Sequence, residues 1–412
     1  MLNSKLEAHY DIIKEKDMIG DDRMYDFDSI VDRRNTSCLK WDSLGTLYGR
    51  EDLIPLWVAD MDFPAAKPIT EALERRARHS IFGYTFPSDD YYNAVIGWMA
   101  RRHNFKVERE WITYTPGVVP ALSYCIRAFT EPGDKVIIQT PVYHPFYSVI
   151  RDNWREIVRN PLKLEDGKYH MDYNDLMKKI DSRTKMLILC SPHNPGGRVW
   201  KEEELKELAD ICIRNNILIV SDEIHFDIVY SGNRHIVLGS ISDEIRDNCV
   251  VLTAPSKTFN IAGLQVSNVI ISNEELRRKY RAEINKDHVS TPNIFGGEAL
   301  IAAYNESEEW LDELLEYLEC NRDFFIDYIN KRIPKLKAME PEGTYLIWVD
   351  CRGLNMSPDE LKDFFVNKCQ LALNDGGMFG EEGKGFMRFN IGCPRSLLKE
   401  ALERIEKAID MV

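Results

Sequence analysis

Short apolar runs recur along the middle of the chain, and helical patterns separate several of them. The runs cover residues 136–139, 186–190, 217–221, 250–253 and 268–272. Uninterrupted apolar runs of this length are typical of strands buried on both faces, as in parallel sheets. Residues 201–215 carry a helical pattern between two of the runs. The alternation predicts an α/β fold whose large domain holds a mostly parallel sheet covered by helices on both faces.

The pattern changes near residue 300. A long amphipathic helix is expected over residues 297–333, then strands near 344–350 and 386–391 with a helix over 358–368 between them, as in a smaller α+β domain. Further helices are expected over residues 67–79, 89–103 and 121–129. Residues 5–16 have a helical pattern, and we expect them to form an arm that docks on a partner subunit. We expect residues 1–69 to form an N-terminal arm and part of the small domain, 70–300 the large cofactor-binding domain, and 301–412 the C-terminal small domain.

Composition narrows the class of protein but does not select its ligand. The 412-residue chain is 44% hydrophobic with a net charge of −14, which argues against nucleic acid as a partner. No apolar run approaches the length of a membrane span, and residues 1–30 hold no secretion signal, so we expect a cytoplasmic protein that does not bind a membrane. The nine cysteines lack metal-type spacing, so we interpret them as reduced core thiols and expect no metal site.

Polar residues follow three of the predicted strands. Asn194 follows the run 186–190, Asp222 and His225 follow 217–220, and Lys257 follows 250–253 beyond Pro255, which has no N–H for a sheet ladder. The carboxyl ends of parallel strands meet at one edge of a sheet, where α/β proteins bind ligands. We therefore expect these side chains to converge, with Lys257 in a loop. A lysine amine in such a site can form a Schiff base if its pKa is lowered.

A glycine-led helix start offers a place for an anion. Gly117 follows Pro116 and precedes the apolar helix expected over residues 121–129. Backbone N–H groups and the helix dipole favour a phosphate at such a position. An ordinary Pro-Gly turn explains the same residues equally well.

Taken together, these positions match the needs of pyridoxal 5′-phosphate (PLP). Lys257 would bind the aldehyde, Asp222 the ring nitrogen and Asn194 the phenolic oxygen, while Tyr143 would stack on the ring and the helix start at Gly117 would take the phosphate. Each residue alone has a structural explanation, as a loop lysine, a helix cap, a turn or a packed aromatic. Their joint occurrence at predicted strand ends and a helix start favours the cofactor.

The order of the motifs carries a resemblance that covers about residue 25 to the C-terminus. The order Asn194-Pro195-Gly196-Gly197, Asp222-Glu223-Ile224-His225 and Ser256-Lys257-Thr258-Phe259-Asn260-Ile261-Ala262-Gly263 resembles the class I/II aminotransferase superfamily, PLP enzymes of fold type I (the aspartate aminotransferase-like fold). Other motifs resemble its MalY/PatB cystathionine β-lyase branch, among them Asp32-Arg33-Arg34, Lys40-Trp41-Asp42, Trp57-Val58-Ala59-Asp60-Met61-Asp62-Phe63, Gly83-Tyr84-Thr85, Glu342-Gly343-Thr344-Tyr345 and Arg388-Phe389-Asn390-Ile391.

The resemblance implies roles that spacing alone does not give. Arg388, with Asn194 beside it, would bind the substrate α-carboxylate, which suits a bidentate guanidinium. Tyr84 would reach the cofactor phosphate of the neighbouring subunit, which makes the active unit a homodimer. A surface arginine and a packed aromatic are the ordinary alternatives for these two residues.

The same resemblance fills in the phosphate site and marks one departure from the family. Ser256, with the amides of Gly117 and Val118, would complete the phosphate cup. Relatives often carry a basic residue eight positions after the lysine, but this chain has Gln265 there, so its cup should hold less positive charge. His225 stands where many aminotransferases place a tyrosine that touches the phenolic oxygen.

The resemblance favours β-elimination from cystathionine or a cysteine S-conjugate, giving pyruvate, ammonia and a thiol. Lys257 would take the Cα proton as general base. An aminotransferase on the same scaffold would use the same residues, so the site residues leave that alternative open. A non-catalytic regulatory protein with this fold is a second alternative, although Lys257, Asp222 and Arg388 are all intact. A Rossmann dehydrogenase is disfavoured because no Gly-x-Gly-x-x-Gly follows an early strand.

Overall fold

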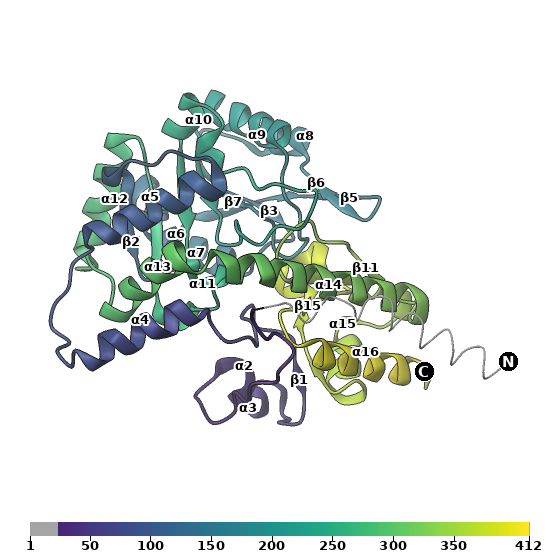
Figure 1. The fold of residues 1–412 in the computed structure, drawn as a ribbon. Coiled ribbons are helices and arrows are strands. Elements are labelled where there is room, and N and C mark those ends of the chain that lie inside the picture. Colours follow the sequence, from purple (N-terminus) through teal and green to yellow (C-terminus); the bar gives the residue numbers. More distant parts are fainter. Residues whose placement is uncertain (1–23, 412) are drawn as a thin grey trace.

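The computed structural model of the protein describes residues 24–411. The arm and helix expected over residues 5–16 lie outside the described residues. The chain builds two groups of elements, one around a seven-stranded sheet and one around a smaller antiparallel sheet (Figure 1). In Figure 1 the first group holds the teal and green middle of the chain, and the yellow C-terminal elements gather beside the purple segment that starts near residue 24.

The larger sheet has the strand order β2-β10-β9-β8-β7-β3-β4. Its strands are β2 (Ile112–Thr115), β3 (Lys135–Thr140), β4 (Glu156–Pro161), β7 (Thr184–Cys190), β8 (Leu218–Asp222), β9 (Cys249–Thr253) and β10 (Ser267–Ile270). β10 runs antiparallel to both of its neighbours, β2 and β9, and the other neighbouring pairs are parallel. The predicted mostly parallel sheet is therefore confirmed. β2 and β4 were not predicted, because β4 is a partly exposed edge strand and β2 carries threonines rather than an apolar run.

Helices cover both faces of this sheet, as the alternation of strands and helices predicts. Along β3, Val136 and Ile138 pack in one core, and Ile137 packs in the other, as the two-residue period of a strand requires. The first core includes α6 (Val118–Phe129), α7 (Pro145–Asp152) and α12 (Glu274–Lys286). The second includes α4 (Lys67–Arg78), α5 (Asp89–His103), α8 (Tyr173–Lys179), α9 (Glu202–Arg214), α10 (Asp243–Asp247) and α13 (Ile294–Glu306).

The single helix expected over residues 297–333 is wrong. The chain forms α13 (Ile294–Glu306) and α14 (Glu308–Arg332), which meet at Ser307. Ser307 is buried with φ −119° and ψ 18°, and its hydroxyl donates to the carbonyl of Ala302 at 3.1 Å. A serine that bonds to nearby backbone competes with the helical ladder, and here it ends the first helix. The hydrophobic period continues across the break, which is why the sequence pattern does not reveal it.

The smaller group of elements joins the two ends of the described chain. Its sheet has the order β11-β12-β15-β14, with β11 (Lys337–Ala338), β12 (Leu346–Asp350), β14 (Asn374–Asp375) and β15 (Phe386–Asn390) all antiparallel. β1 (Ile54–Pro55) pairs with β13 (Leu371–Ala372), so the early chain is tied to the C-terminal part. Further elements include α2 (Leu39–Asp42), α3 (Leu44–Tyr48), the hairpin of β5 (Lys163–Glu165) and β6 (Lys168–His170), α15 (Pro358–Asp363), a π-helical turn (Phe364–Lys368) and α16 (Arg395–Ile409).

Within residues 24–411, no helix combines the length and the apolar character needed to cross a bilayer. Most of the cysteines are buried among core side chains, as we expected for core thiols.

Candidate active site

A cavity of about 200 Å³ lies at the carboxyl ends of β7, β8 and β9. Its lining brings together eight residues that the sequence had singled out: Gly117, Val118, Tyr143, Asn194, Asp222, His225, Ser256 and Lys257. They come from the carboxyl ends of four parallel strands, with Tyr143 following β3, and from the start of α6. Ligands bind at such places in open α/β sheets. One local detail differs from expectation. Lys257 lies on a short helix, α11 (Pro255–Thr258), rather than in a loop, because Pro255 is favoured at a first helical position.

Asp222 is a buried carboxylate at the last position of β8. It is 3% exposed and accepts a hydrogen bond from the backbone N–H of Ile224 at 3.2 Å. Among the described residues, no lysine or arginine forms an ion pair with it. Burial raises its pKa to about 7, and the charge of Lys257 only partly opposes this. A carboxylate held in this way favours a cationic group in the cavity.

Lys257 points its amine at a backbone carbonyl rather than at a carboxylate. Its Nζ donates to the carbonyl oxygen of Ala59 at 2.6 Å. Burial lowers the pKa of Lys257 to about 8, with Asp60 raising it, Arg388 lowering it and Asp222 raising it. A substantial fraction of the amine is therefore neutral near pH 8, which is the form that attacks a carbonyl or accepts a proton.

His225 adds a neutral imidazole to the same wall. Burial, with the charges of Lys257 and Arg388, lowers its pKa to about 3. Its Nδ1 is buried and has no hydrogen-bond partner among the described residues. The ring packs edge-on against Tyr345 at 5.7 Å between centroids. His225 therefore offers the cavity a ring nitrogen that can bond to a ligand without adding charge.

The start of α6 forms the end of the cavity suited to an anion. Gly117 precedes α6, and a side chain there would bring a Cβ within 3.3 Å of Pro120. Ser256 and Gln265 line the same cavity, and Lys257 is the one lysine or arginine among its lining residues. This end of the cavity thus offers an anion backbone N–H groups and a hydroxyl, without a basic side chain at position 265.

Arg388 lies beside this cavity as a buried cation that forms no ion pair with a carboxylate of residues 24–411. Its guanidinium on β15 donates to Asn194 Oδ1 at 3.1 Å, to the carbonyl of Trp57 at 2.8 Å and to Asn374 Oδ1 at 2.5 Å. Its Nε has no partner among the described residues. Burial lowers its pKa to about 10 because all three acceptors are neutral. The site is therefore short of one anion, and a carboxylate would supply it.

Tyr84 is the one candidate residue that this chain does not bring to the cavity. It lies in the segment between α4 and α5, on the left of Figure 1, and its side chain is fully exposed. Ile81, Phe82 and Phe86 in the same segment are exposed as well.

Three groups at the cavity were not predicted from the sequence. The carbonyl of Ala59 accepts from Lys257 and, at 3.0 Å, from the hydroxyl of Tyr345. Cys190 Sγ accepts from the backbone N–H of Asn194 at 3.3 Å and so fixes the turn that carries this residue. The motifs around residues 59 and 345 are recognisable in the sequence, but every residue has a backbone carbonyl, so the sequence does not predict which carbonyl accepts a hydrogen bond.

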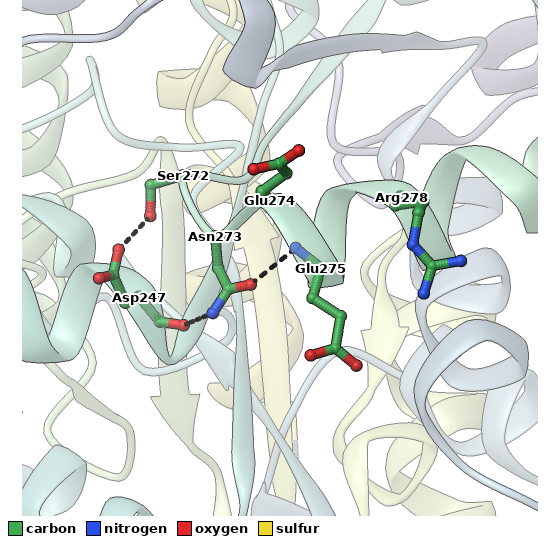
Figure 2. A pocket seen from close by; sticks show the side chains of 6 residues that line it. All are labelled: Asp247, Ser272, Asn273, Glu274, Glu275 and Arg278. Carbon is green, nitrogen blue, oxygen red and sulfur yellow. Dashed lines mark hydrogen bonds between the residues drawn. The ribbon is translucent and has the colours of Figure 1, made fainter.

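A larger hollow of about 510 Å³ lies elsewhere and holds none of the candidate residues (Figure 2). The hollow lies at the N-terminal cap of α12. There Asn273 Oδ1 accepts from the N–H of Glu275 at 3.0 Å, and Ser272 donates to Asp247 at 2.9 Å. The side chains of Ser272 and Asn273 bond to Asp247 and to the helix terminus, so we assign this hollow no ligand. Across residues 24–411, no cluster of three or more His, Cys, Asp or Glu could hold a metal ion.

Comparison with known proteins places this geometry in a family. The model of the family described as aminotransferase class I and II matches residues 51–405. The chain belongs to this family. Cystathionine β-lyase PatB of Bacillus subtilis (strain 168) is 44% identical over 384 residues, covering 93% of this chain and 99% of PatB. Protein MalY of Escherichia coli (strain K12) is 36% identical over 392 residues, covering 94% of this chain and all of MalY.

A solved relative agrees with the fold in detail. A PLP-bound protein from Clostridium difficile 630, provisionally named an aminotransferase, superposes with a TM-score of 0.92 at 48% identity, covering 93% of this chain and 100% of its own. The resemblance to PLP enzymes of fold type I is therefore confirmed, and PLP is the cofactor of this family member.

The residues of this cavity fit PLP on their own chemistry. Asp222 is a buried carboxylate that forms no ion pair within the described part of the chain, which suits a protonated ring nitrogen. Lys257 is a buried amine with a lowered pKa, which suits an aldehyde. The helix start at Gly117 suits a phosphate.

Proposed function

We propose that this aminotransferase-family protein is a PLP-dependent carbon–sulfur β-lyase. Its substrate would be cystathionine or another cysteine S-conjugate, and its products pyruvate, ammonia and a thiol. The observation that carries the choice of elimination is the 44% identity to a cystathionine β-lyase over nearly the whole of both chains. The cavity supports the chemistry that this reaction needs.

Each lining residue has a proposed part in holding the cofactor. Lys257 binds the aldehyde carbon and Asp222 the ring nitrogen. The amides of Gly117 and Val118 and the hydroxyl of Ser256 bind the phosphate. Tyr143 stacks on the ring, and Asn194 and His225 bond to its phenolic oxygen. When bound, PLP supplies an electron sink for negative charge that develops at the substrate Cα.

Arg388 is proposed to bind the substrate α-carboxylate, with Asn194 fixing one side of the guanidinium. The buried charge and the spare Nε donor support this role. A carboxylate would make a charge-assisted bidentate contact, which also orients the substrate. A substrate placed in this way presents its Cα to the amine of Lys257.

Lys257 is proposed to move the proton. The substrate's amino group would take the place of Lys257 on the aldehyde carbon, which frees the lysine amine. That neutral amine would take the Cα proton, and the carbonyl of Ala59 would accept a hydrogen bond from the ammonium that results. The Cβ–S bond breaks, the sulfur leaves with its electron pair, and that thiolate can take the proton from Lys257. Hydrolysis of the released enamine then gives pyruvate and ammonia.

The proposal has three further parts, which concern the dimer, the cellular location and the domain bounds. A homodimer would bring Tyr84 of one subunit to the phosphate in the other, which explains why an aromatic side chain is fully exposed here. The protein would act in the cytoplasm on an amino-acid substrate. Residues 70–300 would form the cofactor-binding domain, with the small domain built from 301–412 and part of 1–69.

The reaction is tested by incubating the purified protein with cystathionine in the absence of any keto acid. Elimination predicts equal amounts of pyruvate and free thiol. Product that appears only after a keto acid is added would instead establish the aminotransferase, an activity favoured by the name of the Clostridium difficile relative. The Lys257→Ala variant should release neither product, and turnover by that variant would overturn the role of Lys257.

A further inference from the structure

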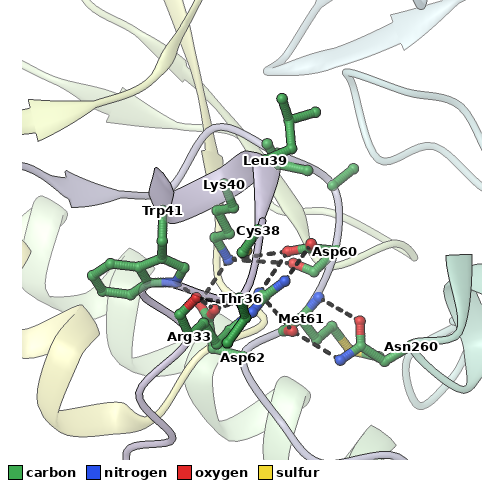
Figure 3. Close-up of polar contacts among 12 residues, drawn as sticks. Arg33, Thr36, Cys38, Leu39, Lys40, Trp41, Asp60, Met61, Asp62 and Asn260 are labelled. Atoms are coloured by element: carbon green, nitrogen blue, oxygen red, sulfur yellow. Dashed lines mark hydrogen bonds and ion pairs between the residues drawn. The ribbon is translucent and has the colours of Figure 1, made fainter. Parts of the chain in front are cut away.

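Four charged side chains form a largely buried cluster that includes the residue after Ala59, and their contacts are drawn in Figure 3. We call Arg33, Lys40, Asp60 and Asp62 the charge cluster. Lys40 is fully buried and donates to Asp62 at 2.6 Å, and Asp62 is 4% exposed. Arg33 binds Asp60 through two bonds, at 3.0 and 2.7 Å, and also Asp62 at 2.7 Å. Two positive and two negative charges balance.

The cluster includes two residues of a segment that has no helix or strand of its own, residues 57–62. Every carbonyl from residue 57 to residue 61 accepts a hydrogen bond from a side chain. Two of these donors are the proposed substrate-binding and proton-transferring residues, because Arg388 donates to Trp57 and Lys257 to Ala59. A segment without a backbone ladder depends on such side chains for its shape.

The same segment is tied to the turn that carries Lys257. Asn260, three residues after Lys257, accepts from the N–H of Met61 at 3.0 Å and donates to the carbonyls of Met61 and Phe63 at 2.8 Å. Figure 3 shows Asn260 on one side of Met61 and the charge cluster on the other. The segment is therefore clamped between the cluster and the lysine-bearing turn.

We propose that the charge cluster is a positioning device for Lys257: it fixes the carbonyl of Ala59 that holds the amine, and it sets how much negative charge from Asp60 reaches that amine. This inference rests on the proposed role of Lys257. Asp60 adjoins Ala59 and is 21% exposed, so its charge is only partly screened by water. Arg33 and Lys40 neutralise it from within the cluster.

Several other groups face the amine of Lys257 and are held constant in the test. Asp222 faces it from the end of β8, His225 from the loop that follows, and Arg388 from β15. Tyr345 shares the carbonyl of Ala59. None of these groups belongs to the charge cluster, so substitutions within the cluster change one source of charge at a time.

The test uses two substitutions with opposite expected signs. Asp60→Asn removes a negative charge near the nitrogen of Lys257 and should disfavour its protonated form. Arg33→Gln leaves Asp60 less neutralised and should favour that form. We expect the pH midpoint of the holoenzyme's cofactor absorbance to fall by about 0.5 to 1 unit in Asp60→Asn and to rise in Arg33→Gln. The acid limb of kcat/KM should move in the same directions.

Matched variants separate this role from general damage to the fold. Arg50→Gln breaks a similar two-bond pair with Asp52 (2.9 and 2.6 Å) at the surface and should leave the midpoint unchanged. Arg33→Lys keeps the charge and should restore most of the wild-type midpoint. A purely structural role predicts lower thermal stability with no change in midpoint, or a change of the same sign in both variants, and either result overturns the inference.

The test still decides the inference if one variant does not fold or if the protein does not catalyse elimination. If Arg33→Gln does not fold, Asp60→Asn decides alone, because an unchanged midpoint in that nearly isosteric variant contradicts the inference. The absorbance titration does not depend on which amino acid is turned over. A protein that eliminates nothing can therefore still show the predicted midpoints.

Discussion

Asp222 should destabilise the PLP-free protein, and removing its charge should stabilise it. The carboxyl is buried, and its pKa is about 7 in the fold against 3.8 for the free side chain. Because one pKa unit is worth about 1.4 kcal/mol, ionised Asp222 costs the PLP-free fold up to about 4 kcal/mol. A carboxyl whose pKa is raised by folding stabilises the fold only while it is protonated. This stability is therefore lost as the pH rises from about 4 to about 7.

The Asp222→Asn variant removes this cost, since an amide of the same shape does not ionise. At pH 8 and without PLP, its free energy of unfolding should exceed that of the wild type by up to about 4 kcal/mol. With PLP bound, the order should reverse, because the carboxylate then faces a cationic ring nitrogen. The dissociation constant for PLP should rise about 30-fold or more in the variant.

Urea unfolding at pH 5 and pH 8, with and without PLP and at one protein concentration, measures both effects. The difference between wild type and variant should be small at pH 5 and large at pH 8. Asp166→Asn, in the exposed turn between β5 and β6, is the control and should change stability by less than about 0.5 kcal/mol. Equal stabilities at pH 8 without PLP, or unchanged PLP affinity, would refute the reasoning.

Three further predictions concern the other proposed site residues. Arg388→Lys should lower kcat/KM for cystathionine about 100-fold or more, because lysine cannot bind the carboxylate through two bonds. The control Arg183→Lys, at an exposed position, should leave kcat/KM unchanged, and equal kinetics in the two variants would contradict the role of Arg388. In PLP-free protein, labelling of Lys257 by fluorodinitrobenzene should rise with pH around a midpoint of about 8, and a midpoint near that of exposed lysines would contradict its lowered pKa. Mixing inactive Tyr84→Ala and Lys257→Ala subunits should restore roughly a quarter of the wild-type activity, because about half of the dimers are then mixed and each mixed dimer holds one intact site out of two. No recovery after verified subunit exchange would show that Tyr84 does not act across the dimer.

The sheet and the residues at its strand ends could be predicted because both depend on local patterns. Apolar runs mark buried strands, and the first polar residues after them, such as Asn194 and Asp222, must lie at the sheet edge. Lys257 was placed by the same argument. Its short helix was missed because Pro255 is compatible both with a loop and with a first helical turn.

The wall that faces Lys257 could not be predicted, because it depends on contacts between distant parts of the chain. Lys257 and Ala59 are 198 positions apart, and the contact uses a backbone carbonyl that any residue could supply. The motif around Asp60 and Asp62 is recognisable in the sequence, yet its charges do not reveal that Lys40 and Arg33 form ion pairs with them. The break at Ser307 could not be predicted either. The hydrophobic period continues through this position, but the buried Ser307 hydroxyl bonds to the backbone and the helix ends there.

Reduction of the holoenzyme with borohydride, followed by peptide mass spectrometry, tests the assignment of Lys257 most directly. Borohydride makes the bond between PLP and its lysine permanent. The peptide that contains Lys257 should gain the mass of reduced PLP, and the absorbance of the bound cofactor should change as it does so. Reduced PLP on a different lysine, or a protein that takes up no PLP at all, would contradict the proposed site.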